Sequence, residues 1–370
     1  MLTREAKSMS DGIDTAVILT GGEGTRLRPL TNNRPKPLLP VLGRPCVEYT
    51  LRAMASAGIQ KVYLACGYKS IEVVKAIGDG SAYGVEIVYA FEEQPMGTAG
   101  AVKLLEKQLP DTYVVAMGDV LMDIDFHHIV SFHKKSGAMV TIALTEVEKP
   151  EQFGIVGLEE DGRITRFKEK PRSDEVFSHL INAGIYVIQN DAFKRVPQDT
   201  KFDFSKNLFP RLLEEGQPLF GLKLRGMWHD IGHPKDLLSA NLGMAERKGV
   251  ERHIFGVEVE GKVCGSKFFA KGARLRGPVY LGDEVRVGEG SLIMRSAIGE
   301  EGVVESGAQV VGSLLLRNCL IRKGAAVRSS VLGEGCLIDE GVTLIDCVLG
   351  DGVSVKGTQV IEGRTLESSI

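Results

Sequence analysis

The sequence predicts an α/β domain with a mixed, mainly parallel sheet, followed by a β-helix of hexapeptide repeats. Three observations support this fold class. From Thr15 to about Met244, apolar strand-like runs alternate with helix-like segments, a pattern typical of a sheet with helices on its faces. A glycine-rich turn follows the first of these strands. From Val263 onward, aliphatic or aromatic residues recur in steps of six residues, occasionally five, as in a β-helix, and this series places Phe269 and Leu316 among the expected core positions.

The first strand contains Val17, Ile18 and Leu19, a run that suits a strand buried on both faces. Further strands are expected at residues 62–65, 85–91 and 113–117, and helices at 47–57, 71–77, 99–107, 126–134 and 234–247. The expected domain boundaries are 14–247 for the sheet domain, 248–262 for a charged connector and 263–360 for the repeats.

A glycine-rich turn after the first strand is a candidate phosphate-binding loop. Gly21, Gly22 and Gly24 let main-chain N–H groups approach a ligand without a Cβ in the way. Arg26 can hold phosphate oxygens with two N–H groups, whereas Lys36 offers a compact charge. Prolines at positions 29, 35, 37, 40 and 45 favour a stiff loop over a helix. The glycines alone would also fit a tight strand-to-helix connection.

The whole string G-G-E-G-T-R-L-R-P-L-T…R-P-K-P-L resembles the signature of nucleoside-diphosphate-sugar pyrophosphorylases. These enzymes join a sugar 1-phosphate to a nucleoside triphosphate and release pyrophosphate on a Rossmann-like nucleotidyltransferase domain. The strings F-E-E-Q-P-M-G-T-A-G-A, I-N-A-G-I-Y and W-H-D-I-G-H-P-K-D are most similar to mannose-1-phosphate guanylyltransferases. The resemblance implies nucleotide contacts at Leu19, Gly21, Gly22, Gly24, Thr25, Glu92, Gly97 and Thr98.

Two aspartates are candidate magnesium ligands. Asp119 follows an apolar strand at the sheet edge where α/β proteins bind ligands, and Asp230 lies in W-H-D-I-G. The resemblance implies that these two carboxylates hold Mg²⁺ jointly, a cation that takes carboxylate and phosphate oxygens. Asp119 could instead be a helix cap or turn residue. Trp228 could simply be core packing.

A sugar-phosphate site is expected downstream. In the segment 163–170 an alternating strand carries several cations, which would fit a solvated sheet edge. The resemblance instead implies that Lys170 of E-K-P binds the sugar phosphate. It also implies that Glu169 and Asn182 bind sugar hydroxyls, and that Gly154 and Gly184 let the sugar approach the backbone.

Glu92 is the candidate residue for reading the base. In the family this position is commonly Gln in uridylyl and thymidylyl transferases. A carboxylate only accepts hydrogen bonds, and guanine offers two neighbouring donors, so Glu92 favours guanine. The alternative is that Gln94 reads the base and that Glu92 and Glu93 are surface charges.

The repeats at 263–360 resemble left-handed β-helix domains appended to several pyrophosphorylases. In other proteins such a domain can carry acetyl transfer with a histidine base, but all seven histidines lie at or before His253. We therefore expect a structural domain that supports a homo-oligomer.

Composition limits the partners. The net charge of −3 and the absence of long basic runs make nucleic acid an unlikely ligand, and no apolar stretch is long enough to span a bilayer. Residues 1–13 lack the core of a signal peptide, so a cytoplasmic enzyme is expected.

The six cysteines form no C-x-x-C pair. The acidic and histidine residues between 123 and 133 fit an amphipathic helix, with the histidines at its ends or on its surface, better than a metal cluster.

The predicted reaction is mannose 1-phosphate plus GTP giving GDP-mannose and pyrophosphate, with Arg26, Lys36, Asp119, Lys170 and Asp230 as catalytic residues and Mg²⁺ as cofactor. One alternative is a glucose-1-phosphate uridylyl- or thymidylyltransferase. Another is a non-catalytic regulatory subunit of the same fold, which the intact set of charged residues disfavours.

Overall fold

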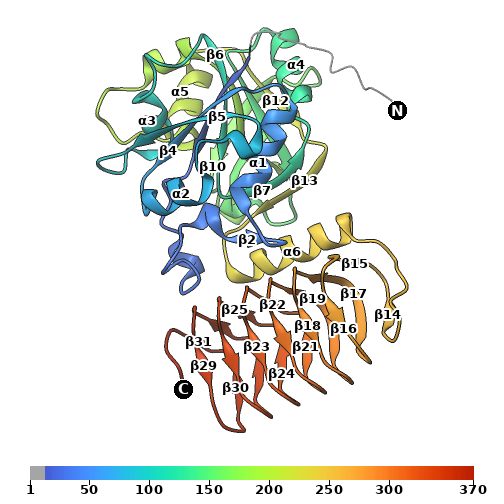
Figure 1. The fold of residues 1–370 in the computed structure, drawn as a ribbon. Helices are drawn as coiled ribbons and strands as arrows, with labels where there is room; N and C mark the ends of the chain where they lie inside the picture. Colours follow the sequence, from blue (N-terminus) through green and yellow to red (C-terminus); the bar gives the residue numbers. More distant parts are fainter. Residues whose placement is uncertain (1–12) are drawn as a thin grey trace. The chain divides into compact units, whose positions relative to one another are not determined.

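The computed structural model describes residues 13–370 and divides into two compact units (Figure 1). The first unit comprises the described residues up to Gly22 together with Val47–Trp228. The second comprises Glu23–Cys46 and His229–Ile370. The proline-rich loop, defined here as residues 23–46, therefore belongs to the same unit as the C-terminal repeats. This assignment differs from the expected boundaries, which are contiguous in the sequence.

The first unit is built on a nine-stranded mixed sheet with the order β10-β9-β11-β6-β1-β4-β5, to which β8 and β12 are added beside β11. The strands are β1 (Thr15–Leu19), β4 (Lys61–Cys66), β5 (Glu86–Phe91), β6 (Thr112–Met117), β8 (Val140–Glu146), β9 (Gly154–Leu158), β10 (Ile164–Glu169), β11 (Leu180–Gln189) and β12 (Leu219–Lys223). The β6-β1-β4-β5 half is parallel, and β11 pairs antiparallel with β6, β8 and β9.

The strand order changes direction at β1. The chain places β4 and β5 on one side of β1 and then β6 on the other. In open α/β sheets the crevice at such a point, at the carboxyl ends of the strands, is the usual ligand site. β1 is fully buried, as its apolar run predicts, so its carboxyl end is held in a fixed position.

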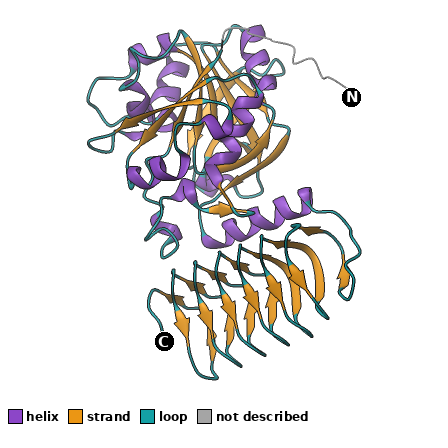
Figure 2. Cartoon of the chain, in the orientation of Figure 1, coloured by secondary structure: helices purple, strands orange, loops and turns teal. Residues whose placement is uncertain are grey.

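Helices and turns cover the sheet (Figure 2). They are α1 (Cys46–Ser56), α2 (Ser70–Ile77), α3 (Gly97–Lys103), α4 (Phe126–Ser136) and α5 (Phe209–Glu214), and a π-helical turn spans Phe204–Leu208. Ala99 and Val102 of α3 share one apolar cluster with Val17 and Val115 of the sheet. A further two-stranded pair joins β7 (Val120–Ile124) to β13 (Gly226–Asp230), whose first three residues belong to this unit. No helix in residues 13–370 is long and apolar enough to cross a membrane.

One histidine of α4 lies elsewhere than expected. His133 is not at the surface, because it falls on the inward face with Phe126 and Ile129 and is only 4% exposed. Its Nδ1 lies 2.9 Å from the Thr141 hydroxyl, and burial lowers the pKa of this imidazole to about 4. His133 is therefore a neutral core residue at physiological pH.

The second unit contains a β-helix, which confirms the predicted fold class. Its strands form three parallel ladders around one aliphatic core, consistent with a left-handed β-helix. They are β14 (Glu258–Glu260), β15 (Val263–Cys264), β16 (Phe269–Ala270), β17 (Arg274–Leu281), β18 (Arg286–Val287), β19 (Leu292–Ile298), β20 (Val303–Val304), β21 (Gln309–Val311), β22 (Leu314–Leu315), β23 (Leu320–Ile321), β24 (Ala326–Arg328), β25 (Val331–Leu332), β26 (Leu337–Ile338), β27 (Thr343–Ile345), β28 (Val348–Leu349), β29 (Ser354–Val355), β30 (Val360–Glu362) and β31 (Thr365–Leu366). β14 lies in the segment expected to be a connector, and β31 extends past residue 360.

Each coil repeats after 17 residues, as the steps of six and five residues imply. Ser313 N–H bonds the Ser296 hydroxyl at 3.1 Å, and Ser330 N–H bonds the Ser313 hydroxyl at the same distance. Two core positions are corrected. Leu315, rather than Leu316, belongs to the core ladder, and Phe269 is 59% exposed because it lies on β16, the edge strand of its ladder.

α6 (Pro234–Lys248) belongs to the second unit as well and contacts β17 and β19. Within the proline-rich loop, two short 3₁₀ turns, Thr25–Leu27 and Lys36–Leu38, precede the hairpin of β2 (Pro40–Val41) and β3 (Arg44–Pro45). The expected absence of a regular helix in this segment is confirmed.

Candidate active site

Three glycine-containing turns converge at the carboxyl ends of β1, β4 and β6. A Cβ on Gly67 would lie 3.1 Å from the Cα of Gly21, and a Cβ on Gly118 would lie 3.0 Å from the Leu19 carbonyl oxygen. These turns can approach so closely only because the residues are glycines. Asp119 follows Gly118 and is half-buried at this edge. Sequence reasoning missed Gly67, although it follows a buried strand as Gly21 and Gly118 do.

Glu92 lies against the glycine turn. Its Oε1 is 3.5 Å from the position a Cβ on Gly21 would take, and its Oε2 accepts a hydrogen bond from Met96 N–H at 3.1 Å. Burial raises the pKa of this carboxyl, and the Met96 bond acts in the opposite direction. Glu93 and Gln94 are exposed. Of the three polar residues in this turn, Glu92 is the one in contact with the glycine turn of β1.

Gly97 and Thr98 begin α3. Gly97 has a φ of +73°, and a Cβ there would lie 2.8 Å from the Phe202 carbonyl oxygen, so only glycine fits. The Thr98 hydroxyl lies 3.4 Å from Asp203 Oδ1 and accepts from Phe204 N–H at 2.9 Å. Asp203, which no sequence pattern marks, connects this turn to the π-helical segment that follows it.

The predicted sugar-binding residues lie around β9, β10 and β11. Gly154 faces Glu169, since a Cβ there would lie 2.8 Å from Glu169 Oε2. Burial raises the pKa of Glu169, while Lys170 and Lys206 lower it. Lys170 is exposed and has a φ of +46°, a strained conformation of the kind often found at functional sites.

The neighbouring cations of β10 have other contacts. Lys168 Nζ lies 2.7 Å from Glu175 Oε1, and the Arg166 guanidinium lies 3.9 Å from the centre of the Phe177 ring. Among the cations of the alternating run, these two therefore serve local packing. Lys170 stays the predicted ligand contact that the family resemblance implies.

Asn182 is engaged within the protein. Its amide nitrogen donates to the Tyr186 hydroxyl at 2.9 Å and to Ser205 Oγ at 3.0 Å, and its oxygen accepts from Gly184 N–H at 2.9 Å. A sugar hydroxyl could therefore use only the second lone pair of the Asn182 oxygen. Gly184 has a φ of +75°, and a Cβ there would lie 2.8 Å from Met117 Cγ. Trp228 donates to the Ala183 carbonyl and packs edge-on against Phe153, so it is a packing residue.

Lys36 and Asp230 are brought together in the second unit. Lys36 is 7% exposed, and its Nζ lies 3.5 Å from Asp230 Oδ1. Gly24, with a φ of +62°, packs on this lysine, since a Cβ there would lie 3.1 Å from Lys36 Cβ. Arg26 is exposed, with Nη1 3.6 Å from the position of a Cβ on Gly232, two residues after Asp230 in the sequence. Thr25 and Gly22 are also exposed.

The donor set suits magnesium better than a softer metal. Within residues 13–370, no group of three or more His, Cys, Asp or Glu side chains is placed so that it could hold a metal ion. Asp125 instead caps α4 by accepting from His127 N–H. Magnesium is commonly bound by one or two carboxylates with substrate phosphates, so Asp119 and Asp230 fit it chemically. Asp119 belongs to the first unit and Asp230 to the second, and their joint coordination stays a prediction.

Two family models match the sequence. The family model described as nucleotidyl transferase matches residues 15–247. The model described as GMPPB C-terminal domain matches residues 275–368. The mannose-1-phosphate guanylyltransferase of Mycobacterium tuberculosis is 35% identical over 278 residues, covering 75% of this chain and 77% of that protein. The UTP--glucose-1-phosphate uridylyltransferase of Synechocystis is 33% identical over 302 residues, covering 77% and 78%.

A relative from Drosophila pseudoobscura pseudoobscura, mannose-1-phosphate guanylyltransferase catalytic subunit beta, is 39% identical over 228 residues, covering 60% of each chain. Among solved structures, a putative glucose-1-phosphate thymidylyltransferase from Bacillus anthracis, in complex with a sucrose, aligns with a TM-score of 0.58. It shares 26% identity and covers 64% of this chain and 97% of that chain.

Proposed function

Since this chain belongs to the nucleotidyl transferase family, we propose that it transfers GMP from GTP to mannose 1-phosphate, forming GDP-mannose and pyrophosphate. That the chain is a sugar-1-phosphate nucleotidyltransferase follows from the family model and from relatives named for this activity. The names of the relatives from Mycobacterium and Drosophila favour guanylyl transfer to mannose 1-phosphate.

The choice of GTP is supported by one observation: the carboxylate of Glu92 lies against Gly21. Guanine presents the N1–H and the N2 amino group side by side, and a carboxylate can accept from both. Uracil and thymine present one donor and one acceptor, which an amide would match better. A half-buried carboxylate in this turn therefore favours guanine over the pyrimidines.

A second candidate is uridylyl or thymidylyl transfer to glucose 1-phosphate. The names of the Synechocystis relative and of the Bacillus anthracis structure favour it. A non-catalytic role for the fold is disfavoured because the charged residues that the reaction would use, Arg26, Lys36, Asp119, Lys170 and Asp230, are all present.

The proposed mechanism needs no protein nucleophile. An oxygen of the sugar phosphate attacks the α-phosphorus of the nucleotide in line, the bond to the β-phosphate oxygen breaks, and pyrophosphate leaves. Arg26 and Lys36 hold the triphosphate and neutralise the negative charge that grows on the leaving group. Lys170 binds the sugar phosphate, so that two anions that repel one another are held in reacting order.

Asp119 and Asp230 are the proposed ligands for Mg²⁺, which would supply positive charge to the phosphate oxygens when bound. In its pairing with Lys36, Asp230 also orients the lysine ammonium group, since the two charged atoms lie 3.5 Å apart. Asp230 therefore has two roles in this proposal, as a metal ligand and as a partner of the triphosphate-binding lysine.

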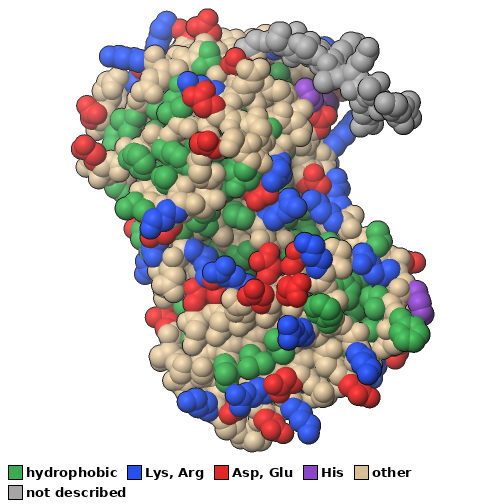
Figure 3. Space-filling model, in the orientation of Figure 1, with side chains coloured by type: hydrophobic (Ala, Val, Ile, Leu, Met, Phe, Trp, Pro, Cys, Tyr) green, Lys and Arg blue, Asp and Glu red, His purple; other side chains and the backbone are tan. Residues whose placement is uncertain are grey.

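We also propose that the β-helix unit mediates association with a second copy of the chain. Hydrophobic side chains reach the surface of this unit (Figure 3), and Phe255, at a turn tip, is 95% exposed. Beside it lies a groove of about 670 Å³ that is lined by Ile254, Phe269 and neighbouring apolar residues, with cations at Lys271, Arg286 and Lys323. The proposed contact is packing of Phe255 of one copy into this apolar groove of another.

The function is tested by measuring pyrophosphate release for ATP, GTP, CTP, UTP and TTP, each with mannose 1-phosphate and with glucose 1-phosphate. The highest kcat/KM is expected for GTP with mannose 1-phosphate. A higher value for UTP or TTP with glucose 1-phosphate would favour the second candidate. Absence of pyrophosphate release for every pair would favour a non-catalytic subunit.

A further inference from the structure

The proline-rich loop is held by side chains of the β-helix. The Arg34 guanidinium lies between two carboxylates on successive coils, with Nη1 2.9 Å from Glu334 Oε1 and Nη2 2.7 Å from Asp351 Oδ2. The Arg34 side chain is 13% exposed, and that of Asp351 is 16% exposed. Asn33 adds a bond to Asp351 Oδ2 at 3.2 Å. The Asn33 bond is exposed, but the Arg34–Asp351 pair is largely buried, and such a pair is stronger than an ordinary surface ion pair.

The two carboxylates are themselves oriented by the coils. Asp351 Oδ1 accepts from the backbone N–H of Glu334 at 2.8 Å, which leaves Oδ2 for Arg34. Glu334 Oε2 lies 3.0 Å from Arg317 Nε, one coil earlier, which leaves Oε1 for Arg34. The β-helix therefore presents a preformed pair of acceptors that matches the planar fork of an arginine.

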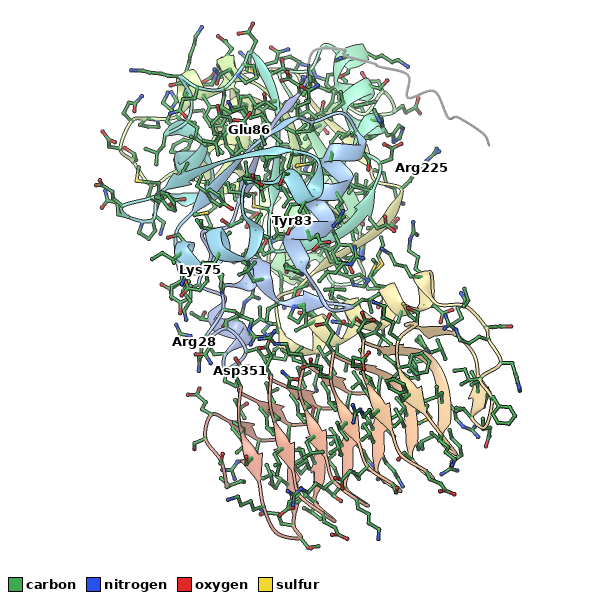
Figure 4. All side chains as sticks on the ribbon, viewed as in Figure 1. Arg28, Lys75, Tyr83, Glu86, Arg225 and Asp351 are labelled. Carbon is green, nitrogen blue, oxygen red and sulfur yellow. The ribbon has the colours of Figure 1, made fainter. Side chains whose placement is uncertain are left out.

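Apolar contact supports the same arrangement. A Cβ on Gly350 would lie 3.1 Å from Pro29 Cβ, so the coil turn packs directly on the loop. Figure 4 shows Asp351 at this turn of the β-helix and Arg28 on the loop. The glycine before Asp351 thus lets the loop approach the carboxylate pair.

The far end of the loop is anchored by α6. Asn241 is 2% exposed, its Oδ1 accepts from Leu42 N–H at 2.8 Å, and its Nδ2 donates to the Pro40 carbonyl at 3.2 Å. Lys36 lies between these two anchors, two residues after Arg34 and four before Pro40. Since it contains only two 3₁₀ turns and a short hairpin before α1 begins, the loop depends on such anchors for a fixed shape.

We propose that Arg34, Glu334 and Asp351 form a clamp by which the β-helix positions Lys36, and with it Arg26, for catalysis. The proposal rests on the proposed function, because it assigns these two cations to the triphosphate. The three clamp residues are positioning residues, since none of them is assigned to a substrate. The C-terminal domain is then required for the chemistry of a single chain, in addition to any role in self-association.

The test compares Arg34→Met, Asp351→Asn and the double variant with a matched control, Asp339→Asn. Asp339 also pairs with an arginine of the β-helix, Arg322, at 3.1 Å, but neither residue contacts the loop. With GTP and mannose 1-phosphate, the two single variants should lose about tenfold or more in kcat, with a smaller change in the KM for mannose 1-phosphate. The double variant should be no worse than Arg34→Met, because both substitutions remove one clamp. The control should keep the wild-type kcat.

Amide hydrogen exchange tests the clamp independently of the proposed enzymatic reaction. In wild-type protein, Leu38 N–H and Leu39 N–H bond the carbonyls of Pro35 and Lys36. Arg34→Met should speed exchange at these amides, while amides of the core ladder at β23 and β26 stay protected. If Arg34→Met does not fold, Arg34→Lys, which keeps the charge but not the fork, should show the same pattern more weakly.

Three results would overturn the clamp: unchanged exchange in the loop, unchanged kcat in variants whose loop exchange is faster, or fully multiplicative losses in the double variant. If wild-type protein released no pyrophosphate with any substrate pair, the proposed function would fail. The exchange data would then still decide whether the β-helix holds the loop.

Discussion

Replacing Glu92 by Gln should change the preferred base. The substitution keeps the shape of the side chain but replaces one acceptor oxygen with an NH₂ donor, which would face a donor of guanine. In the structure Glu92 is half-buried, and one oxygen already accepts from Met96 N–H. A hydrogen bond to a charged group contributes about 1.5–3 kcal/mol, and a neutral one about 0.5–1.5 kcal/mol. The loss for GTP should therefore be roughly 2 kcal/mol, or about thirtyfold in kcat/KM.

The assay is kcat/KM for GTP and for UTP with mannose 1-phosphate, with Glu93→Gln as the matched control at an exposed neighbour. UTP use should stay constant or rise in Glu92→Gln, because an amide matches the uracil edge. The pH profile gives a second test. Since burial raises the pKa of Glu92, acidification should protonate it at a higher pH than an ordinary glutamate and so reduce GTP use first. The Gln variant should lack this step. An unchanged GTP-to-UTP ratio in Glu92→Gln, with a changed ratio in Gln94→Ala, would refute the assignment.

Three further predictions follow from the same structure. Asp119→Asn should lower kcat about a hundredfold, or roughly 3 kcal/mol, with an unchanged melting temperature, because it removes a proposed metal ligand; magnesium-dependent turnover at the wild-type rate would contradict this. Gly97→Ala should lower the free energy of unfolding by more than about 1 kcal/mol in a denaturant titration, because its φ is +73° and a Cβ would meet the Phe202 carbonyl; equal stability would show that the turn can shift. Phe255→Asp should weaken self-association in sedimentation velocity without loss of secondary structure; the wild-type mass at all concentrations would exclude this surface.

The parts of the fold set by local patterns could be predicted from the sequence. β1 and the turn that follows it were expected because a buried strand and a glycine turn are encoded within a few residues. The coils of the β-helix were expected for the same reason, since the aliphatic period continues for many turns. The core position at Leu315 could not be distinguished from Leu316 in the sequence, because adjacent leucines make the register ambiguous there.

Long-range features could not be predicted in the same way. Arg34 and Asp351 are 317 residues apart, and neither has a local pattern that marks it as a partner of the other. The three hydrogen bonds of Asn182 depend on Ser205 and Tyr186, which the packing of the sheet and the π-helical turn brings together. Likewise, His133 is buried because its helix face is set by Phe126 and Ile129, although the residue type suggested a surface position.

The central claim is that a carboxylate at the glycine turn selects GTP for transfer to a sugar 1-phosphate. The most direct test is a competition in which equal concentrations of GTP and UTP react with limiting mannose 1-phosphate, and the two nucleotide sugars are separated and measured. We predict that GDP-mannose exceeds the uridine product by at least about tenfold. An equal or larger amount of the uridine product would contradict the claim.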